Sequence, residues 1–171
     1  MAKNYTIRSL VMIIKIKKLT ETAQMPKKNF ASDACFDLYL DAPDALYHEW
    51  NGGVEVKAAR GIKIRPHETV MLHTGIAMET PVGYYAAIYA RSGLASKQGL
   101  RPANCTGIID AAYRGEVMVA MHNDSDETRI VHHNDRIAQM AILPVLDVKL
   151  VETDKLSETE RGSGGFGSSG K

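Results

Sequence analysis

Five short segments of the chain carry side chains that can do chemistry, and they are spread over most of its length. They are residues 34–38, 90–94, 104–117, 134–139 and 161–171. In the first, Asp37 stands between apolar residues, where a carboxylate is either exposed to solvent or held by a cation or a metal. In the second, Arg91 and Ser92 place a cation and a hydroxyl at the start of an expected helical turn. That arrangement favours anion binding, although a simple N-cap explains Ser92 almost as well.

The next two segments are ambiguous when each is taken alone. Asp110 lies near the bend of an expected hairpin, where a turn residue is more common than a catalytic acid. Tyr113 is of a type that is usually half buried for packing. Asp135 and Arg136 fit a solvated turn pair, and Gln139 in the following strand fits an outward-facing residue without a role. Neither segment identifies a function by itself.

The last segment is rich in glycine and serine. Residues 165–171 read G-x-x-x-x-G-K, which nearly completes a phosphate-binding P-loop, but that motif also needs a Ser or Thr and a helix after the Lys. The alternative is a flexible Gly/Ser tail. Arg161 and Phe166 argue against an inert tail, because a nucleotide-binding lid uses a ring to stack on a base and an Arg to pair with phosphate.

The composition is that of an ordinary globular chain of one domain. Its 171 residues are 44% hydrophobic and 24% charged, with a net charge of +1. A nucleic-acid-binding protein usually has a strong basic excess, so we expect no stable binding to nucleic acid. The longest apolar run near the N-terminus, residues 10–14, is too short to span a bilayer, so we expect no membrane partner. Cys35 and Cys105 show no CxxC spacing, which indicates a reducing, cytoplasmic compartment, that of the host if the protein is viral.

Short alternating patterns separated by turn residues predict the elements that position these segments. Strands are expected over residues 14–17, 70–78, 116–121, 137–145 and 148–151, with Pro144 at a strand edge or end. One helical turn is expected over residues 94–98, capped by Ser92 and ended by Gly99. Many short strands with turns between them predict an all-β sandwich or barrel.

In this order and at these separations, the five segments resemble the five motifs of the trimeric dUTPase family. The most specific parts are residues 91–95 (RSGLA), 107–110 (GIID), 113–115 (YRG), 135–139 (DRIAQ), 161–162 (RG) and 164–168 (GGFGS). The chain departs from the family pattern where Cys35 and Asn134 replace Gly, where Ala112 replaces a second acid, and where residues 89–90 (YA) replace Ala-Pro. Asn134 can adopt the left-handed conformation that Gly favours, whereas Cys35 requires a negative φ or a local adjustment.

The resemblance implies a fold and an assembly. The fold is all-β, a dUTPase-like distorted jelly-roll barrel with one short helix over residues 1–156, followed by a mobile, Gly-rich C-terminal lid arm over residues 157–171. The assembly is a homotrimer with three shared active sites, in which the segments around Asp37, Arg91 and Gln139 come from one chain, the hairpin from a second and the arm from a third. Residues 42–60 exceed the family norm and are expected to form an inserted loop or hairpin, available for contact with another protein.

The resemblance also implies the reaction, which is Mg²⁺-assisted attack of water on the α-phosphate of dUTP, giving dUMP and pyrophosphate. Asp110 is then the general base, Gln139 helps to hold the water, and Asp37 reaches the Mg²⁺ through water. Asp135 and Arg136 brace the site. The implied substrate-binding residues are Arg91, Ser92, Gly93, Asn104, Gly107, Ile109, Tyr113, Arg161, Phe166, Gly167, Ser168 and Ser169. Such an enzyme keeps uracil out of DNA and supplies dUMP for dTMP synthesis.

Two alternatives remain open at this point. A dCTP deaminase shares the fold but needs a general acid/base Glu in the pocket and usually lacks the Gly-rich lid, whereas this chain has Asp110 and the lid motif. A dUTP-binding regulatory protein on the same fold, contacting a partner through residues 42–60, is a second alternative. Asp110, Gln139 and Arg161 favour retained catalysis over a purely regulatory role.

Overall fold

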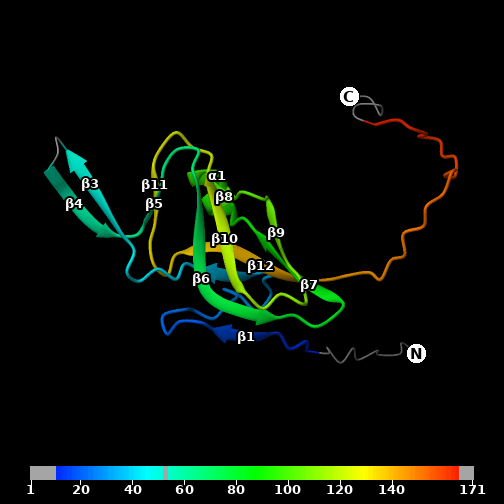
Figure 1. Cartoon of the computed structure of the whole chain (residues 1–171), viewed down its shortest axis with the longest axis horizontal. Coiled ribbons are helices and arrows are strands. Elements are labelled where there is room, and N and C mark those ends of the chain that lie inside the picture. The colour runs from blue at the N-terminus through cyan, green and yellow to red at the C-terminus, as the bar shows by residue number, and fades with distance from the viewer. Residues whose placement is uncertain (1–10, 52–53, 166–171) are drawn as a thin grey trace, which may run out of the picture.

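Two four-stranded antiparallel sheets make up most of the structure, a computed structural model that describes residues 11–51 and 54–165 (Figure 1). For residues 46–51 and 54–60 only the backbone is described. The first sheet contains, in spatial order, β1 (Lys15–Lys18), β6 (Thr69–Glu79), β10 (Glu116–Asn123) and β8 (Leu100–Pro102). The second contains β2 (Phe36–Tyr39), β12 (Arg136–Pro144), β7 (Tyr84–Tyr89) and β9 (Thr106–Ile109). The sheets share one core in a jelly-roll-like arrangement rather than a closed barrel, which confirms the prediction of an all-β fold.

Smaller elements stand at the margins of the two sheets. They are the pair of β5 (Ile62–Ile64) and β11 (Arg129–Val131), the hairpin of β3 (Leu46–Asn51) and β4 (Val54–Arg60), and the helix α1 (Ser92–Gln98). Figure 1 shows the β3–β4 hairpin projecting from the body of the molecule. In the described part of the chain, no helix is long and apolar enough to cross a membrane.

The ends of α1 differ slightly from the expectation. Gly99 terminates the helix with a left-handed φ of 69°, as predicted. Arg91, in extended backbone, occupies the N-cap position, and Ser92 is the first helical residue. The capping role expected for Ser92 is therefore wrong by one position, and no side chain caps this helix.

The alternating pattern of β10 is confirmed, and that of β6 holds up to Thr74, after which every residue to Met78 is buried. Leu72 and Ile76 in β6, like Val117 and Val119 in β10, are buried, whereas Met118 between the last two is exposed. The two strands pair along most of their length, and a β-bulge interrupts their register near the start of β10. This bulge lies beside the candidate site.

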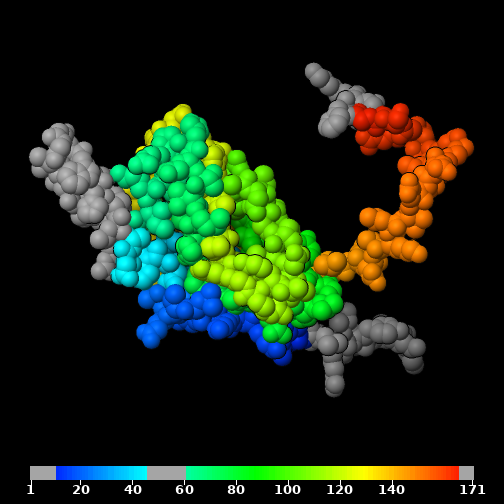
Figure 2. All heavy atoms as spheres, in the orientation of Figure 1, coloured from blue at the N-terminus to red at the C-terminus, as the bar shows by residue number. Residues whose placement is uncertain are grey.

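The strand expected over residues 148–151 is not formed. β12 ends at Pro144, and the chain then leaves the body as an extended segment (Figures 1 and 2). Val148 and Leu150 are 69% and 93% exposed. A strand needs a neighbour to complete its hydrogen bonds, and the described part of the same chain places none beside this segment.

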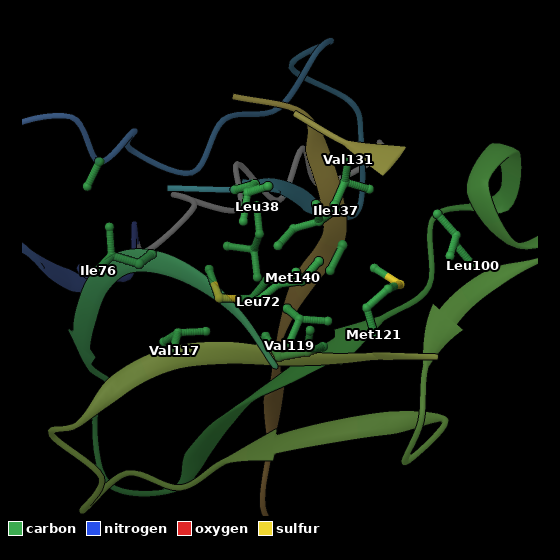
Figure 3. Packing of buried hydrophobic residues seen from close by; sticks show 14 of the residues in the cluster. Leu38, Leu72, Ile76, Leu100, Val117, Val119, Met121, Val131, Ile137 and Met140 are labelled. Carbon is green, nitrogen blue, oxygen red and sulfur yellow. The ribbon is translucent and has the colours of Figure 1, made fainter. Parts of the chain in front are cut away.

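A hydrophobic core between the two sheets fixes their spacing (Figure 3). It includes Leu72 and Val119 from the first sheet and Leu38, Ile137 and Met140 from the second. All five side chains are at most 3% exposed. Burial of a side chain of this size contributes about 1.5–3 kcal/mol. The core therefore holds the outward-facing residues of β2 and β12 at fixed separations.

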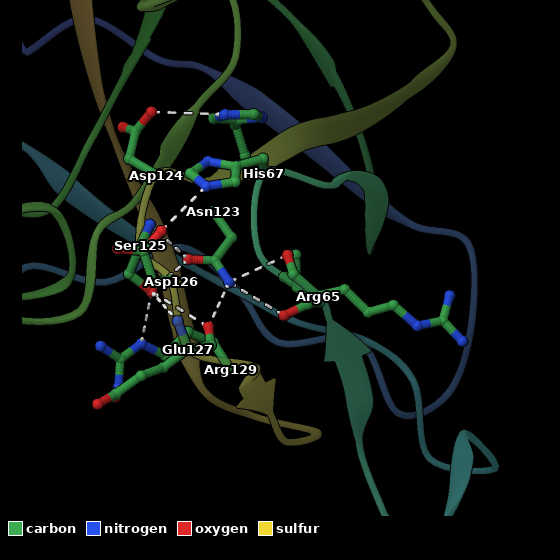
Figure 4. Close-up of polar contacts among 10 residues, drawn as sticks. Arg65, His67, Asn123, Asp124, Ser125, Asp126, Glu127 and Arg129 are labelled. Carbon is green, nitrogen blue, oxygen red and sulfur yellow. Dashed lines mark hydrogen bonds and ion pairs between the residues drawn. The ribbon is translucent and has the colours of Figure 1, made fainter.

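Asn123, the last residue of β10, ties together the loops at one end of the sandwich (Figure 4). Its amide nitrogen donates to the carbonyls of Ile64 and Arg65, each at 3.1 Å, and of Glu127 at 2.8 Å. Its Oδ1 accepts from the backbone N–H of Ser125 at 3.0 Å and from the Ser125 hydroxyl at 2.7 Å. The residue is fully buried, so water cannot replace these partners.

We expect Asn123→Ala to lower the free energy of unfolding by about 2–4 kcal/mol, because it leaves several buried groups without partners. Urea denaturation measures the change. Asn29→Ala, at an exposed position, is the control and should change stability by less than about 0.5 kcal/mol. Equal effects of the two substitutions would show that the Asn123 network does not stabilise the fold.

Candidate active site

Asp37 lies on the outer face of β2, where two arginines hold its carboxylate. Leu38, the next residue, points into the core, so the alternation of the strand turns Asp37 outward. Oδ1 accepts a hydrogen bond from Arg91 Nε at 2.8 Å, and Oδ2 lies 3.2 Å from Arg136 Nη1. The Asp37 side chain is 14% exposed. Of the two alternatives left open for this acid, cations hold it and solvent does not.

A groove of about 540 Å³ lies over these ion pairs. Its lining includes Asp37, Arg91, Arg136, Gln139, Cys35 and Phe30. Gln139 is the cross-strand neighbour of Asp37, and its Nε2 donates to the Ala90 carbonyl at 2.8 Å. This bond orients the amide and leaves its oxygen as an acceptor. With Asp33, which also lines it, the groove thus combines two carboxylates, two cations and a neutral oxygen, a set that suits a phosphate ligand and its counterion.

The residues beside this cluster have distinct positions. Ser92 and Gly93 are exposed in the first turn of α1, directly after Arg91. Asp135 closes the turn before β12, because its Oδ2 accepts from the backbone N–H of His132 at 2.7 Å. The expected turn pair of Asp135 with Arg136 is therefore replaced by the pair of Arg136 with Asp37.

The two glycine replacements use different backbone conformations. Asn134 has a φ of 72°, in the left-handed region, as expected. The φ of Cys35 is not positive, so this residue meets the expected requirement for a negative value. Burial raises the pKa of the Cys35 thiol, which keeps this neighbour of Asp37 protonated at neutral pH. Cys105, which the sequence did not single out, has a φ of 61°.

A second pocket, of about 310 Å³, lies between β9 and β10. Its lining includes Asn104, Gly107, Ile109, Asp110, Tyr113 and Glu116. The expectation that these two strands pair as a hairpin is wrong, because β9 pairs with β7 whereas β10 pairs with β6 and β8. The two strands instead lie in different sheets. Their separation leaves the pocket open to solvent, with the exposed Asp110 at its margin.

Tyr113 is held at the wall of this second pocket. Its hydroxyl donates to the backbone carbonyl of Glu116 at 2.9 Å. A Cβ atom at Gly115 would lie 2.5 Å from that hydroxyl oxygen, so the glycine is what lets the ring approach. Glu116 was not proposed as a site residue from the sequence. The only feature of the sequence that could have pointed to it is a charged residue at the first position of a strand.

The groove and the pocket share no lining residue. One chain therefore does not bring Asp110 to Gln139. Arg161 lies on the extended C-terminal segment, where its Nε donates to the Gly164 carbonyl at 2.9 Å. Four residues expected at the site lie outside the described part of the chain: Phe166, Gly167, Ser168 and Ser169.

Comparisons with known proteins agree with this geometry. The dUTPase family model matches residues 46–170. The deoxyuridine 5′-triphosphate nucleotidohydrolase of Hydrogenobaculum sp. is 43% identical over 159 residues, covering 93% of this chain and 99% of that protein. Its counterpart in Nautilia profundicola is 39% identical over 160 residues, covering 94% and 100%. The solved structure of Staphylococcus bacteriophage 80alpha dUTPase with dUPNHPP superposes with a TM-score of 0.77 at 26% identity, covering 94% of this chain and 100% of that one. A family model that matches most of the chain, together with relatives that align over nearly all of it, shows that the chain belongs to the dUTPase family.

Proposed function

We propose that the protein hydrolyses dUTP to dUMP and pyrophosphate, and does so as a homotrimer with shared active sites. The observation that carries the proposal is that this dUTPase-family chain has two separate pockets, each lined by residues suited to a different part of the substrate. One is a groove with Asp37, Arg91 and Gln139, and the other is an open pocket with Asp110 and Tyr113. A nucleoside triphosphate has an uncharged base at one end and a polyanion at the other, which matches this division.

The pocket between β9 and β10 suits the base and the sugar. Its volume is near the lower end of the usual range for small-molecule sites. One edge of β9 pairs with β7, and the backbone groups on its other edge are free to bind a ligand. Together with the Asn104 amide, these groups can form hydrogen bonds with the edge of uracil and so reject cytosine. Tyr113 beneath the sugar excludes a 2′-hydroxyl. Loss of one such contact weakens transition-state binding by about 1–3 kcal/mol.

The groove suits the phosphates. Arg91 supplies positive charge, and the exposed Ser92 and Gly93 supply donors from the start of α1. Asp37 keeps Arg91 in place through the 2.8 Å hydrogen bond. Arg161 adds a further cation when the arm of a neighbouring copy closes over the site.

The residues of the groove also fit a magnesium ion carried by the substrate. The described residues contain no group of three or more His, Cys, Asp or Glu side chains that could hold a metal by themselves. Mg²⁺ keeps several waters and is usually bound by one or two carboxylates with substrate phosphates, so Asp37 is its expected partner through water. When bound, the ion neutralises charge on the triphosphate.

Asp110 and Gln139 act on the water. The Asp110 carboxylate, exposed at the margin of the pocket, takes a proton from the attacking water. The Gln139 oxygen, oriented by the bond of its amide to the Ala90 carbonyl, accepts a hydrogen bond from the same water. In this scheme Asp110 comes from a different chain than Gln139, because the pocket and the groove of one chain are separate.

The exposed C-terminal segment supports a multichain assembly. Val145, Leu146, Val148, Leu150 and Val151 are between 54% and 93% exposed. Exposed apolar residues in a row are unfavourable in water and mark a contact surface. A neighbouring copy that covers them would also carry Arg161 towards a second or third chain. In the cell, the same reaction keeps uracil out of DNA and supplies dUMP for dTMP synthesis.

A panel of dUTP, dTTP, dCTP and UTP with Mg²⁺, scored for pyrophosphate release, tests the proposed function. We expect rapid release from dUTP alone. Release of ammonia from dCTP would favour a deaminase instead, and a dUTP complex that persists for hours without turnover would favour a regulatory role.

We expect Asp110→Asn to lower kcat for dUTP by a factor of about 10²–10⁴, because the amide cannot accept the proton. Binding of a non-hydrolysable dUTP analogue, measured by calorimetry, should be nearly unchanged. The control is Asp126→Asn, at a turn acid outside both pockets that contacts His67. Unchanged turnover in Asp110→Asn would remove this residue as the base.

Two truncations separate the roles of the C-terminal segment. A chain that ends after Thr159 keeps the apolar residues and should remain trimeric with severely reduced kcat. A chain that ends after Pro144 loses those residues and should also lose the trimer. Sedimentation and steady-state kinetics measure both effects. Normal kcat in the first truncation would exclude a lid role for the arm.

A further inference from the structure

The placement of Tyr113 depends on a residue outside the expected site. The Tyr113 hydroxyl donates to the backbone carbonyl of Glu116, which is the first residue of β10. Gly115 leaves the space that the ring occupies. The position of the ring is therefore set by the start of β10, and whatever anchors that point of the strand also anchors Tyr113.

The Glu116 side chain provides such an anchor. Its Oε1 accepts a hydrogen bond from the backbone N–H of Gly75 at 2.8 Å, and its Oε2 lies 2.8 Å from His73 Nδ1. Both partners belong to β6, the neighbouring strand. The Glu116 side chain is 22% exposed, so water competes weakly for these bonds. One carboxylate thus joins β10 to β6 at two points.

The Gly75 N–H needs this carboxylate because β6 bulges here. Glu116 is opposite Ala77, but Met118 is already opposite His73, so β6 has extra residues between the two pairs. The bulge requires a glycine, since Gly75 has a φ of 64° and a Cβ atom there would lie 2.3 Å from Asp41 Oδ2. A backbone N–H turned out of the ladder requires another acceptor, and Glu116 supplies it.

We propose that Glu116 is a positioning residue for nucleotide discrimination. It fastens the start of β10 to the β6 bulge, and its own backbone carbonyl then holds the Tyr113 ring against the sugar. The inference rests on the proposed function, because it takes the ligand of this pocket to be a deoxyuridine nucleotide. Glu116 acts through Tyr113, and no contact of its carboxylate with substrate is required.

The test compares Glu116→Ala with Glu116→Gln. The alanine variant removes the acceptor for Gly75, so we expect the ratio of kcat/KM for dUTP to that for UTP to fall about tenfold, the equivalent of losing one interaction worth about 1.4 kcal/mol. The glutamine variant keeps an acceptor oxygen and should retain the ratio to within about threefold, the loss expected for a neutral in place of a charged acceptor. Glu79→Ala is the control. Glu79 lies only two residues beyond Ala77, the partner of Glu116, but it pairs with Lys15 and not with Gly75, so its loss should leave the ratio unchanged.

Hydrogen exchange of the Gly75 amide, followed by NMR, gives a readout that needs no activity. Exchange should accelerate in Glu116→Ala and stay slow in Glu116→Gln, which tests the anchor even if the wild-type protein failed to hydrolyse dUTP. Gly115→Ala displaces Tyr113 directly, and it should lower the dUTP-to-UTP ratio while Gly75 exchange stays slow. This second variant keeps the inference testable if Glu116→Ala does not fold.

Two results would overturn the proposal. One is an unchanged dUTP-to-UTP ratio in folded Glu116→Ala, or in Gly115→Ala if the former does not fold. The other is a glutamine variant as impaired as the alanine variant, because the anchor would then not be a hydrogen bond to Gly75.

Discussion

β9 and β10 follow one another in the chain, yet each forms its hydrogen bonds with a different neighbour. β9 adds to the edge of the second sheet through β7, while β10 lies inside the first sheet between β6 and β8. A two-stranded ladder would fill the space between them with backbone hydrogen bonds. Because that ladder is absent, backbone groups and the side chains of Asn104 and Tyr113 line an open pocket instead. The pocket with Asp110 and Tyr113 depends on this separation of the two strands.

The separation has to be held, and two features hold it. The hydrophobic core keeps β7 and β10 in their own sheets. The β6 bulge, with the Glu116 carboxylate on the Gly75 N–H, fixes the point at which β10 begins. A strand end that was free to shift would let Tyr113 move with it, and the pocket would lose its shape.

The groove over Asp37 is organised by charge as well as by the pairing of β2 with β12. Arg91 and Arg136 approach the same carboxylate from different elements, and each neutralises part of it. This arrangement fixes Arg91 at the wall of the groove. Gln139 completes the groove because it lies directly across from Asp37 on β12. Such preorganisation is what phosphate-transfer sites require of the protein.

The sequence by itself determined the class of fold and most candidate residues. The alternation in β6 and β10 reports which side chains face the core, since neighbouring side chains of a strand point to opposite faces. The motifs around Arg91, Asp110 and Gln139 pointed to the dUTPase family, which the family model and the aligned relatives then showed.

Only the tertiary structure decided which strands pair and which charges meet. The pattern of residues 148–151 is that of a strand, but a ladder needs a neighbour, and the described part of the chain offers none. Arg136 follows Asp135 in sequence yet pairs with Asp37, and β9 pairs with β7 and not with β10. The role of Glu116 could be inferred only from its hydrogen bond to Gly75 in the β6 bulge. Local patterns record the environment of each residue, whereas pairing depends on contacts between segments far apart in the chain, which no local pattern encodes.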